Sequence, residues 1–307
     1  MPLAQGEDID EATGRKVIDE SLTPQRWDQP NVEGVLPQGE DIDEAAGDEE
    51  EFQYEDEEIE EEEQPLEEYL GLGANEPLRV LVVCAHPDDA EFGAAGTVAA
   101  WTKAGREVYY AIVTRGDKGS NDPEMTSDRL AQIREREQRE AAAVLGVKEV
   151  VFLGFKDGEL VPNMALRSAI TRAIRQFRPH ILIAQDPTAL FYNNRFINHP
   201  DHRAAGLASV DAVYPTARDH LQFPEQLAEG LQPHKVAEVF LIQSEAPDIL
   251  VDISETLETK IAALQKHASQ FEDPAALGER VRERARELGE QGGMDYAEAF
   301  RRIIIRR

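Results

Sequence analysis

Residues 78–93 read LRVLVVCAHPDDAEFG, and this stretch decides the fold. Its first seven residues are almost all apolar and rich in valine and leucine, which is typical of a strand buried on both faces of a parallel sheet. A histidine and two aspartates follow at once, and the alanine-rich residues 90–103 then predict a helix. A buried strand that runs into a helix begins a βαβ unit, in which ligands bind at the carboxyl end of the strand.

The same alternation continues along the chain. Further strands are expected over residues 108–114, 149–153, 180–184, 236–243 and 248–253, and further helices over residues 127–145, 164–177, 201–213 and 254–270. Strands that alternate with helices indicate right-handed crossovers and a parallel sheet covered on both faces. We therefore predict an α/β protein, a Rossmann-like three-layer sandwich with a mostly parallel sheet.

Charged residues are distributed unevenly along the 307 residues of the chain. Residues 1–75 hold 26 of the 61 acidic residues but only 3 of the 32 Lys and Arg residues, so this segment carries −23 of the net charge of −29. So acidic a segment buries too little apolar surface to offset the entropy lost on ordering. We expect an acidic, disordered extension over residues 1–75 and a single α/β domain over residues 76–307.

The acidic extension contains the peptide QGEDIDEA twice, at residues 5–12 and 38–45. This duplication is too short to be a structural repeat. Two roles remain open for the extension: a solubilising or self-shielding tail, and a docking segment for a basic partner.

The sequence says less about the cellular compartment and the binding partners than about the fold. The chain shows no basic-then-apolar leader and no apolar run of about 18 residues, so we expect a cytoplasmic protein that binds neither membranes nor nucleic acid. The single cysteine, Cys84, closes an apolar run and is expected to be a buried structural thiol. A homo-oligomer is possible.

A cluster of metal-ligating residues follows the first predicted strand. His86 and Asp89 are three residues apart across a strand-to-helix turn, so both side chains can converge on one cation while Asp88 points elsewhere. A nitrogen and an oxygen ligand suit zinc or a neighbouring divalent metal.

A second cluster, NHPDHR at residues 198–203, can supply the third ligand. Pro200 is suited to the first position of a helix, which would place His199 at the helix entrance and His202 one turn inside. Either cluster alone could simply cap a turn, but their joint occurrence after two strands favours a catalytic metal site with open positions for water. His180, His220, His234 and His267 have no such neighbours and are expected to be structural or surface residues.

From Leu78 to its C-terminus, the sequence resembles the LmbE-like or PIG-L-like family of N-deacetylases. The resemblance rests on AHPDD at residues 85–89, followed by Glu91, Gly93, Gly96 and Thr97, and on HPDH at residues 199–202. It implies an LmbE-like fold and one Zn²⁺ per chain, or another divalent metal. The ligands would be His86, Asp89 and His202, with Asp88 as the general base and His199 as the group that stabilises the oxyanion.

Other segments match the family less specifically. They are TRGDKGS at residues 114–120, Arg134 with Glu137, and Asp157 with Gly158. By resemblance, Arg134 and Asp157 would face the sugar, although Arg134 could equally form a helix-surface ion pair with Glu137. Ala90 departs from the family, because many relatives carry glutamate after the paired aspartates.

The expected function is a metal-dependent hydrolase that removes an N-acetyl (acyl) group from an amino-sugar conjugate such as an N-acetylglucosamine derivative. The small-molecule N-acyl amino sugar is then the principal partner. The alternative with the same metal site is an amidase that acts on a thiol conjugate or another N-acyl small molecule. A nucleotide-binding module is disfavoured because the dinucleotide fingerprint is absent. An interaction protein that works through its acidic tail is disfavoured by the complete ligand set.

Overall fold

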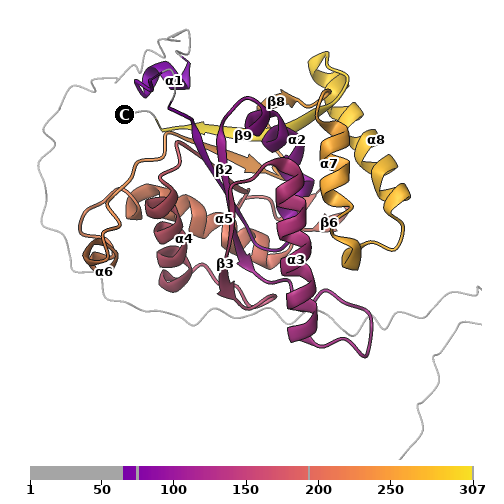
Figure 1. Ribbon diagram of the computed structural model, residues 1–307, viewed down its shortest axis with the longest axis horizontal. Helices are drawn as coiled ribbons and strands as arrows, with labels where there is room; N and C mark the ends of the chain where they lie inside the picture. The colour runs from indigo at the N-terminus through magenta and orange to yellow at the C-terminus, as the bar shows by residue number, and fades with distance from the viewer. Residues whose placement is uncertain (1–64, 74–75, 193, 306–307) are drawn as a thin grey trace, which may run out of the picture. The chain divides into compact units, whose positions relative to one another are not determined.

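A seven-stranded sheet forms the centre of the fold in the order β3-β2-β1-β4-β7-β9-β8 (Figure 1). The structure is a computed structural model, and it describes residues 65–73, 76–192 and 194–305. The strands β3, β2, β1, β4 and β7 are parallel, whereas β9 is antiparallel to both β7 and β8. The mostly parallel α/β fold is therefore confirmed.

The strands are β1 Arg79–Cys84, β2 Glu107–Thr114, β3 Glu149–Phe155, β4 Ile181–Gln185, β5 Phe191–Tyr192, β6 Phe196–Ile197, β7 Glu238–Ile242, β8 Ile249–Asp252 and β9 Ala297–Ile304. The α-helices are α1 Leu66–Tyr69, α2 Asp89–Lys103, α3 Ser127–Leu145, α4 Met164–Phe177, α5 Pro200–Asp211, α6 Pro224–Ala228, α7 Leu257–Leu264 and α8 Pro274–Gly292. A π-helical turn, η1 Ala212–Thr216, extends α5, and a 3₁₀ turn, η2 Ala268–Gln270, follows α7.

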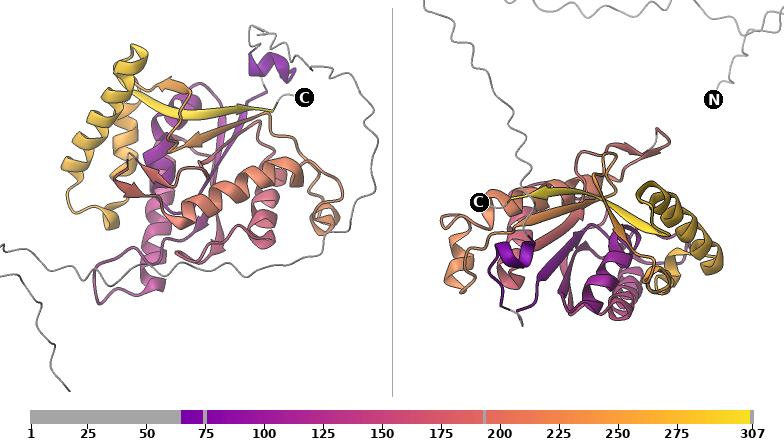
Figure 2. Two further views of the ribbon diagram at one scale, coloured as in Figure 1. Left: turned by 180° about the vertical axis from the view of Figure 1, so that it is seen from behind. Right: turned by 90° about the horizontal axis from the view of Figure 1, so that it is seen from above.

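Strand β1 lies in the middle of the sandwich because both of its faces are apolar. Val80, Val82 and Cys84 pack on one side in a core cluster that contains residues of α2 and α3. Leu81 and Val83 pack on the other side in a cluster that contains residues of α4 and α5. The two helical layers on opposite faces of the sheet can be followed in Figure 2. Cys84 is fully buried, as expected of a structural thiol.

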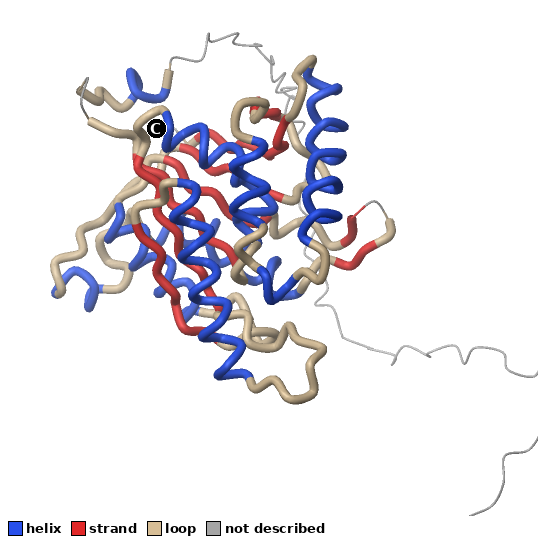
Figure 3. Tube along the Cα trace, turned by 45° about the vertical axis from the view of Figure 1, so that its right-hand side comes forward, coloured by secondary structure: helices blue, strands red, loops and turns tan. Residues whose placement is uncertain are grey.

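The predicted elements up to α5 are found with shifted ends, whereas the C-terminal third differs more. The predicted helix over residues 254–270 is α7 followed by a turn and η2, and α8, β9 and the short β5–β6 hairpin were not predicted. Figure 3 shows α8 as a long helix at the edge of the molecule. A third apolar cluster, which includes Ile261 of α7 and Val281 of α8, holds these two helices together.

The described residues 65–73 belong to the packed structure. Leu66 of α1 is buried in the same core cluster as Val80, and Glu67 forms an ion pair with Arg106, whose Nη2 lies 3.3 Å from Glu67 Oε1. The expectation of disorder for residues 1–64, and with it the duplicated peptide, lies outside the described residues. Among the described helices, not one combines the length and the apolar character that a bilayer crossing requires.

Candidate metal and active site

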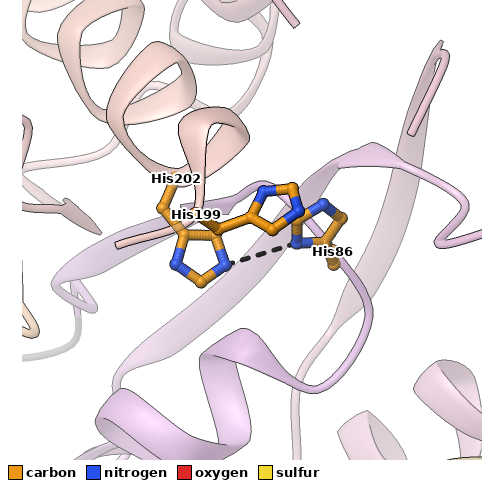
Figure 4. A group of neighbouring side chains, drawn as sticks. All are labelled: His86, His199 and His202. Atoms are coloured by element: carbon orange, nitrogen blue, oxygen red, sulfur yellow. Dashed lines mark hydrogen bonds between the residues drawn. The ribbon is translucent and has the colours of Figure 1, made fainter. Parts of the chain in front are cut away.

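The two clusters found in the sequence come together at the carboxyl edge of the sheet. His86 follows β1, Asp89 begins α2, and His199 and His202 lie at the start of α5. Helix α5 can approach this edge because Gly206 packs against the end of β4, where a Cβ atom would lie only 2.2 Å from the carbonyl oxygen of Gln185. Figure 4 shows the three histidine rings gathered at this point.

Three side chains present ligand atoms to one another at nearly equal distances. His86 Nδ1 lies 3.3 Å from His202 Nε2 and 3.4 Å from Asp89 Oδ2, and His202 Nε2 lies 3.1 Å from Asp89 Oδ1. Ligands bound tetrahedrally at about 2.0–2.1 Å from a zinc-sized ion lie about 3.3–3.4 Å apart. Each pair of side chains therefore has the spacing of two zinc ligands, and Asp89 faces the two histidines with different carboxylate oxygens.

The hydrogen bonds behind the two rings leave these nitrogen atoms free to be ligands. His86 Nε2 lies 3.1 Å from Asp157 Oδ1 and 3.3 Å from Asp201 Oδ2, so this nitrogen carries a hydrogen. His202 Nδ1 in the same way faces Asn198 Oδ1 at 3.1 Å. Carboxylate and amide partners of this kind fix the orientation of metal-binding histidines in other proteins.

The site carries a surplus of negative charge. Although burial opposes a charged ring, hydrogen bonds to Asp157, Asp201 and Asp89 raise the pKa of His86 to about 12. The ring therefore takes a second proton when nothing else supplies positive charge, and a metal ion would replace that proton. The donor set, its spacing and its charge all fit a small divalent cation.

Asp89 is held in a fixed orientation by its neighbours. Its Oδ2 accepts hydrogen bonds from the backbone N–H of His86 at 2.8 Å and from Gln185 Nε2 at 3.0 Å. Although burial opposes ionisation, His202 and His86 hold the pKa of this carboxyl well below its usual range. The oxygen that faces His202, Oδ1, is thereby left for a metal ion.

In the described part of the chain, two groups of side chains have possible ligand atoms that all lie within 4.8 Å of one another, namely His86 with His199 and His202, and His86 with Asp157 and Asp201. We prefer the set that contains Asp89 for two reasons. Asp201 is fully buried and its Oδ2 already accepts the backbone N–H of Gly158 at 2.7 Å. His199 Nδ1 accepts the backbone N–H of Asp201 at 3.1 Å, which fixes the other ring nitrogen as its hydrogen-bond donor.

Asp88 lies beside this ligand set but is held by different partners. It caps α2 in the left-handed region with φ +88°, a conformation that few residues other than glycine adopt. Its Oδ2 lies 3.3 Å from Arg134 Nη2. Burial raises the pKa of Asp88 to about 7, even though the charge of Arg134 acts to lower it. A carboxyl with this pKa can exchange a proton near neutral pH.

A chain of buried polar groups supports the strained backbone of Asp88. Its N–H donates to Gln138 Oε1 at 3.0 Å, Gln138 Nε2 donates to Glu91 Oε1 at 2.8 Å, and Glu91 Oε2 lies 3.2 Å from His267 Nε2. Gln138, Glu91 and His267 are all fully buried. His267 was expected to be structural, and it contributes to the active-site scaffold by holding Glu91.

His199 offers a neutral donor. Its ring packs edge-on against His86 with 4.7 Å between ring centroids. Burial and the charge of His86 lower its pKa. Because Nδ1 accepts a backbone N–H, the hydrogen of the neutral ring is on Nε2. The group that the family resemblance implies for oxyanion stabilisation is therefore a neutral N–H donor in this structure.

Arg134 and Asp157 contact protein groups as well as the pocket. Arg134 is buried and donates to the carbonyl oxygens of Pro87 at 2.7 Å and Gly116 at 3.0 Å. It therefore does not lie on the helix surface, and Glu137 bonds to Ser269. A pocket of about 360 Å³ is lined by His86, Asp88, Asp89, Lys118, Gly119, Arg134, Asp157, Gly158, His199 and His202. All seven residues predicted from the sequence thus meet in one pocket.

Sequence reasoning did not assign roles to Asp201, Gln138, Glu91 or Gln185. Asp201 lies inside the HPDH motif and Glu91 two residues after the AHPDD motif, so both could have been recognised as candidate site residues. Gln138 and Gln185 carry no such signal, because each reaches the site only through the packing of a helix or strand that is distant in sequence.

Comparison with known proteins finds N-deacetylases that are similar to this chain. The sequence profile of the PIG-L family, described as GlcNAc-PI de-N-acetylase, matches residues 81–213. The diacetylchitobiose deacetylase of Thermococcus kodakarensis is 35% identical over 238 residues, which cover 76% of this chain and 87% of that protein. A probable N-acetyl-α-D-glucosaminyl L-malate deacetylase of Bacillus anthracis is 32% identical and covers 62% of this chain and 81% of that protein.

A solved structure shows the same fold. The N,N′-diacetylchitobiose deacetylase of Pyrococcus horikoshii superposes with a TM-score of 0.68 at 32% identity, covering 78% of this chain and 90% of that chain.

Proposed function

Because this chain belongs to the PIG-L family of N-deacetylases, we propose that it hydrolyses the N-acetyl group of an N-acetylglucosamine derivative with the help of one bound zinc ion. The observation that carries the proposal is that His86, Asp89 and His202 meet in pairs at 3.1–3.4 Å. The carboxyl of Asp88, which is not among the proposed ligands, lines the same pocket. Two nitrogen ligands and one oxygen ligand, with an open position toward a pocket, suit zinc in a catalytic role.

The proposed ligands are His86, Asp89 and His202. When bound, zinc supplies two kinds of help, namely polarisation of the amide carbonyl and acidification of a water molecule. The remaining roles fall to the side chains around the ligands.

Asp88 is proposed to accept the proton from the attacking water. Its carboxyl lines the pocket, is not among the proposed ligands and has a pKa raised to about 7 by burial. The same group can then pass the proton to the leaving amine. Arg134 positions this carboxyl through the contact at 3.3 Å between Nη2 and Oδ2.

His199 is proposed to donate its Nε2–H to the oxygen that becomes negatively charged during the attack. A single donor of this type is worth about 3–4 kcal/mol in a pocket that excludes water. The ring is oriented for this by the backbone bond to Nδ1 and by its packing on His86.

Arg134 and Asp157 are proposed to act mainly as positioning residues, for Asp88 and for His86 respectively. Both also line the pocket, so both are in reach of a sugar hydroxyl. Each of these residues can position its partner and still contact the sugar.

Release of acetate tests the proposed function. We expect the purified chain to release acetate from N-acetylglucosamine derivatives and to leave the matched N-acyl thiol conjugates intact. Preferred turnover of the thiol conjugates would place the chain with the amidases that the same metal site can support. No acetate from any N-acetyl sugar would contradict the proposal.

We also propose that the deacetylase unit begins near residue 65. Removal of residues 1–64 is expected to leave the melting temperature and acetate release unchanged, because every proposed ligand and catalytic group lies between residues 86 and 202. Removal of residues 1–75 would also expose the core around Leu66, whose burial contributes about 2 kcal/mol. The melting temperature should therefore fall by several degrees only in the longer truncation. Equal melting temperatures for the two truncations would show that Leu66 contributes nothing to the domain.

A further inference from the structure

A second and larger cavity lies at the same edge of the sheet as the candidate site. Its lining residue Gln243 follows β7, and the neighbouring strand β4 ends at Gln185, which bonds to Asp89. The cavity has a volume of about 690 Å³, compared with about 360 Å³ for the pocket at the metal site. One wall is the inner face of α8, with Leu277, Val281, Ala285 and Leu288 spaced three or four residues apart, and β9 contributes part of the opposite wall. We name this cavity the α8 groove. Its size and its apolar wall are those of a small-molecule site.

The end of the α8 groove nearest the metal site is polar. Lys260 Nζ lies 2.5 Å from Glu298 Oε1 and donates to the carbonyl oxygen of Phe92 at 2.7 Å. Both charged side chains are almost completely buried, at 7% and 4% exposure. Phe92 lies in the first turn of α2, three residues after Asp89. The groove thus begins at the helix that supplies a proposed metal ligand.

Gln243 lines the same end and has two unusual features. Its backbone is left-handed, with φ +56°, and its amide oxygen is buried without a hydrogen-bond partner in the described part of the chain. Strained backbones and unsatisfied amides are concentrated at ligand sites, where a bound group can offset their cost. Rotation of this amide would offer a donor or an acceptor to a ligand in the groove.

Tyr192 connects the α8 groove with the candidate site. It lines the groove and pairs with Phe196 across the β5–β6 hairpin, and the chain continues from there to His199. Asn198 anchors the hairpin by donating from Nδ2 to the carbonyl oxygen of Ala189 at 2.7 Å.

We propose that the α8 groove receives the aglycone of the substrate, so that the acylated sugar lies in the pocket at His86 and Asp88 while an attached alkyl or aryl group lies along α8. This inference rests on the proposed function and names its substrate class: N-acyl amino sugars with an apolar aglycone. The polar end at Lys260 and Gln243 suits the linkage region, and the α8 wall suits the apolar remainder.

The hexyl and methyl glycosides of N-acetylglucosamine test this proposal in the full-length protein. Each methylene buried from water strengthens binding roughly four-fold. We expect KM for the hexyl glycoside to be at least about tenfold lower than for the methyl glycoside, with kcat unchanged, because the groove binds substrate and transition state equally.

Two variants fill or charge the groove without touching the catalytic groups. Leu288→Trp and Leu288→Glu should each remove the preference for hexyl while leaving the kinetics of the methyl glycoside intact, which also shows that the variant is folded. Glu283→Trp is the matched control, because Glu283 is an exposed α8 residue outside the groove lining. It should keep the preference.

Calorimetry with the deacetylated products, hexyl and methyl glucosaminide, separates the two proposals. If no sugar releases acetate, the proposed function fails, while the ratio of the two dissociation constants still decides whether the groove binds an alkyl group. Equal constants for the two products in the wild type, or a hexyl preference that survives both groove variants, would overturn the inference. A drop in oligomer mass caused by Leu288→Glu, without any hexyl preference, would assign the groove to a second copy of the chain and would also overturn it.

Discussion

Replacing His202 or Asp89 with alanine is expected to abolish metal binding and deacetylation together. Each change removes one of three side chains whose nitrogen and oxygen atoms lie 3.1–3.4 Å apart in pairs. Loss of a residue that only hydrogen-bonds to a ligand costs about 10–100-fold in metal affinity, so loss of a ligand itself should cost more. Metal analysis of the purified variants, together with acetate release, measures both effects.

The matched control for this prediction is His220→Ala. His220 is an exposed histidine outside the pocket lining, and its replacement should leave about one metal ion per chain and normal turnover. A fully metal-loaded His202→Ala protein would remove His202 from the ligand set. The group formed by His86, Asp157 and Asp201 would then become the candidate metal site.

Replacing Asp88 with asparagine is expected to lower kcat while the metal stays bound. Asparagine is the right substitution because it tolerates the left-handed backbone that Asp88 adopts at φ +88°, whereas alanine would add strain there. The variant keeps a side chain of the same shape but cannot accept a proton. Loss of a general base typically lowers kcat by about 10²–10⁴-fold.

Glu140→Gln controls for the loss of a carboxylate, because Glu140 is exposed on α3 and does not line the pocket. We expect normal kcat and metal content for this variant. An Asp88→Asn protein that retains zinc and turns over normally would show that another group accepts the proton. Loss of zinc from the same protein would make Asp88 a ligand.

The sequence could predict the first half of the molecule because its signals are local. The run at residues 78–84 forms a strand buried on both faces, and the change to His-Pro-Asp-Asp marks the carboxyl end of that strand. Six of the seven predicted site residues lie within or just after such motifs, and Arg134 lies inside α3. The structure brings all seven into one pocket.

The C-terminal third was predicted less well for two reasons. Helix α8 has recognisable boundaries, with Asp273 capping its start, Pro274 in the first turn and Gly293 after its end, but its many charged residues hide the apolar positions. Strand β9 alternates poorly and is stabilised by antiparallel pairing with β7 and β8, so its formation depends on strands that lie far away in the sequence.

The groups that support the site could not be predicted from spacing. Gln138 meets the backbone of Asp88 across 50 residues, and His267 meets Glu91 across 176 residues. These contacts follow from how α3 and the segment after α7 pack against α2. The contact between Asp157 and His86 Nε2 at 3.1 Å also depends on the fold, whereas the family resemblance implied only a sugar contact for Asp157.

Reconstitution of the metal-free protein with zinc tests the central claim most directly. The chain is stripped with a chelator, zinc is added in fractions of an equivalent, and acetate release from an N-acetylglucosamine derivative is measured at each step. The account predicts negligible release without metal and a linear rise that ends at one zinc ion per chain. Full activity in the metal-free chain, or a rise that continues to two equivalents, would contradict a single catalytic site at His86, Asp89 and His202.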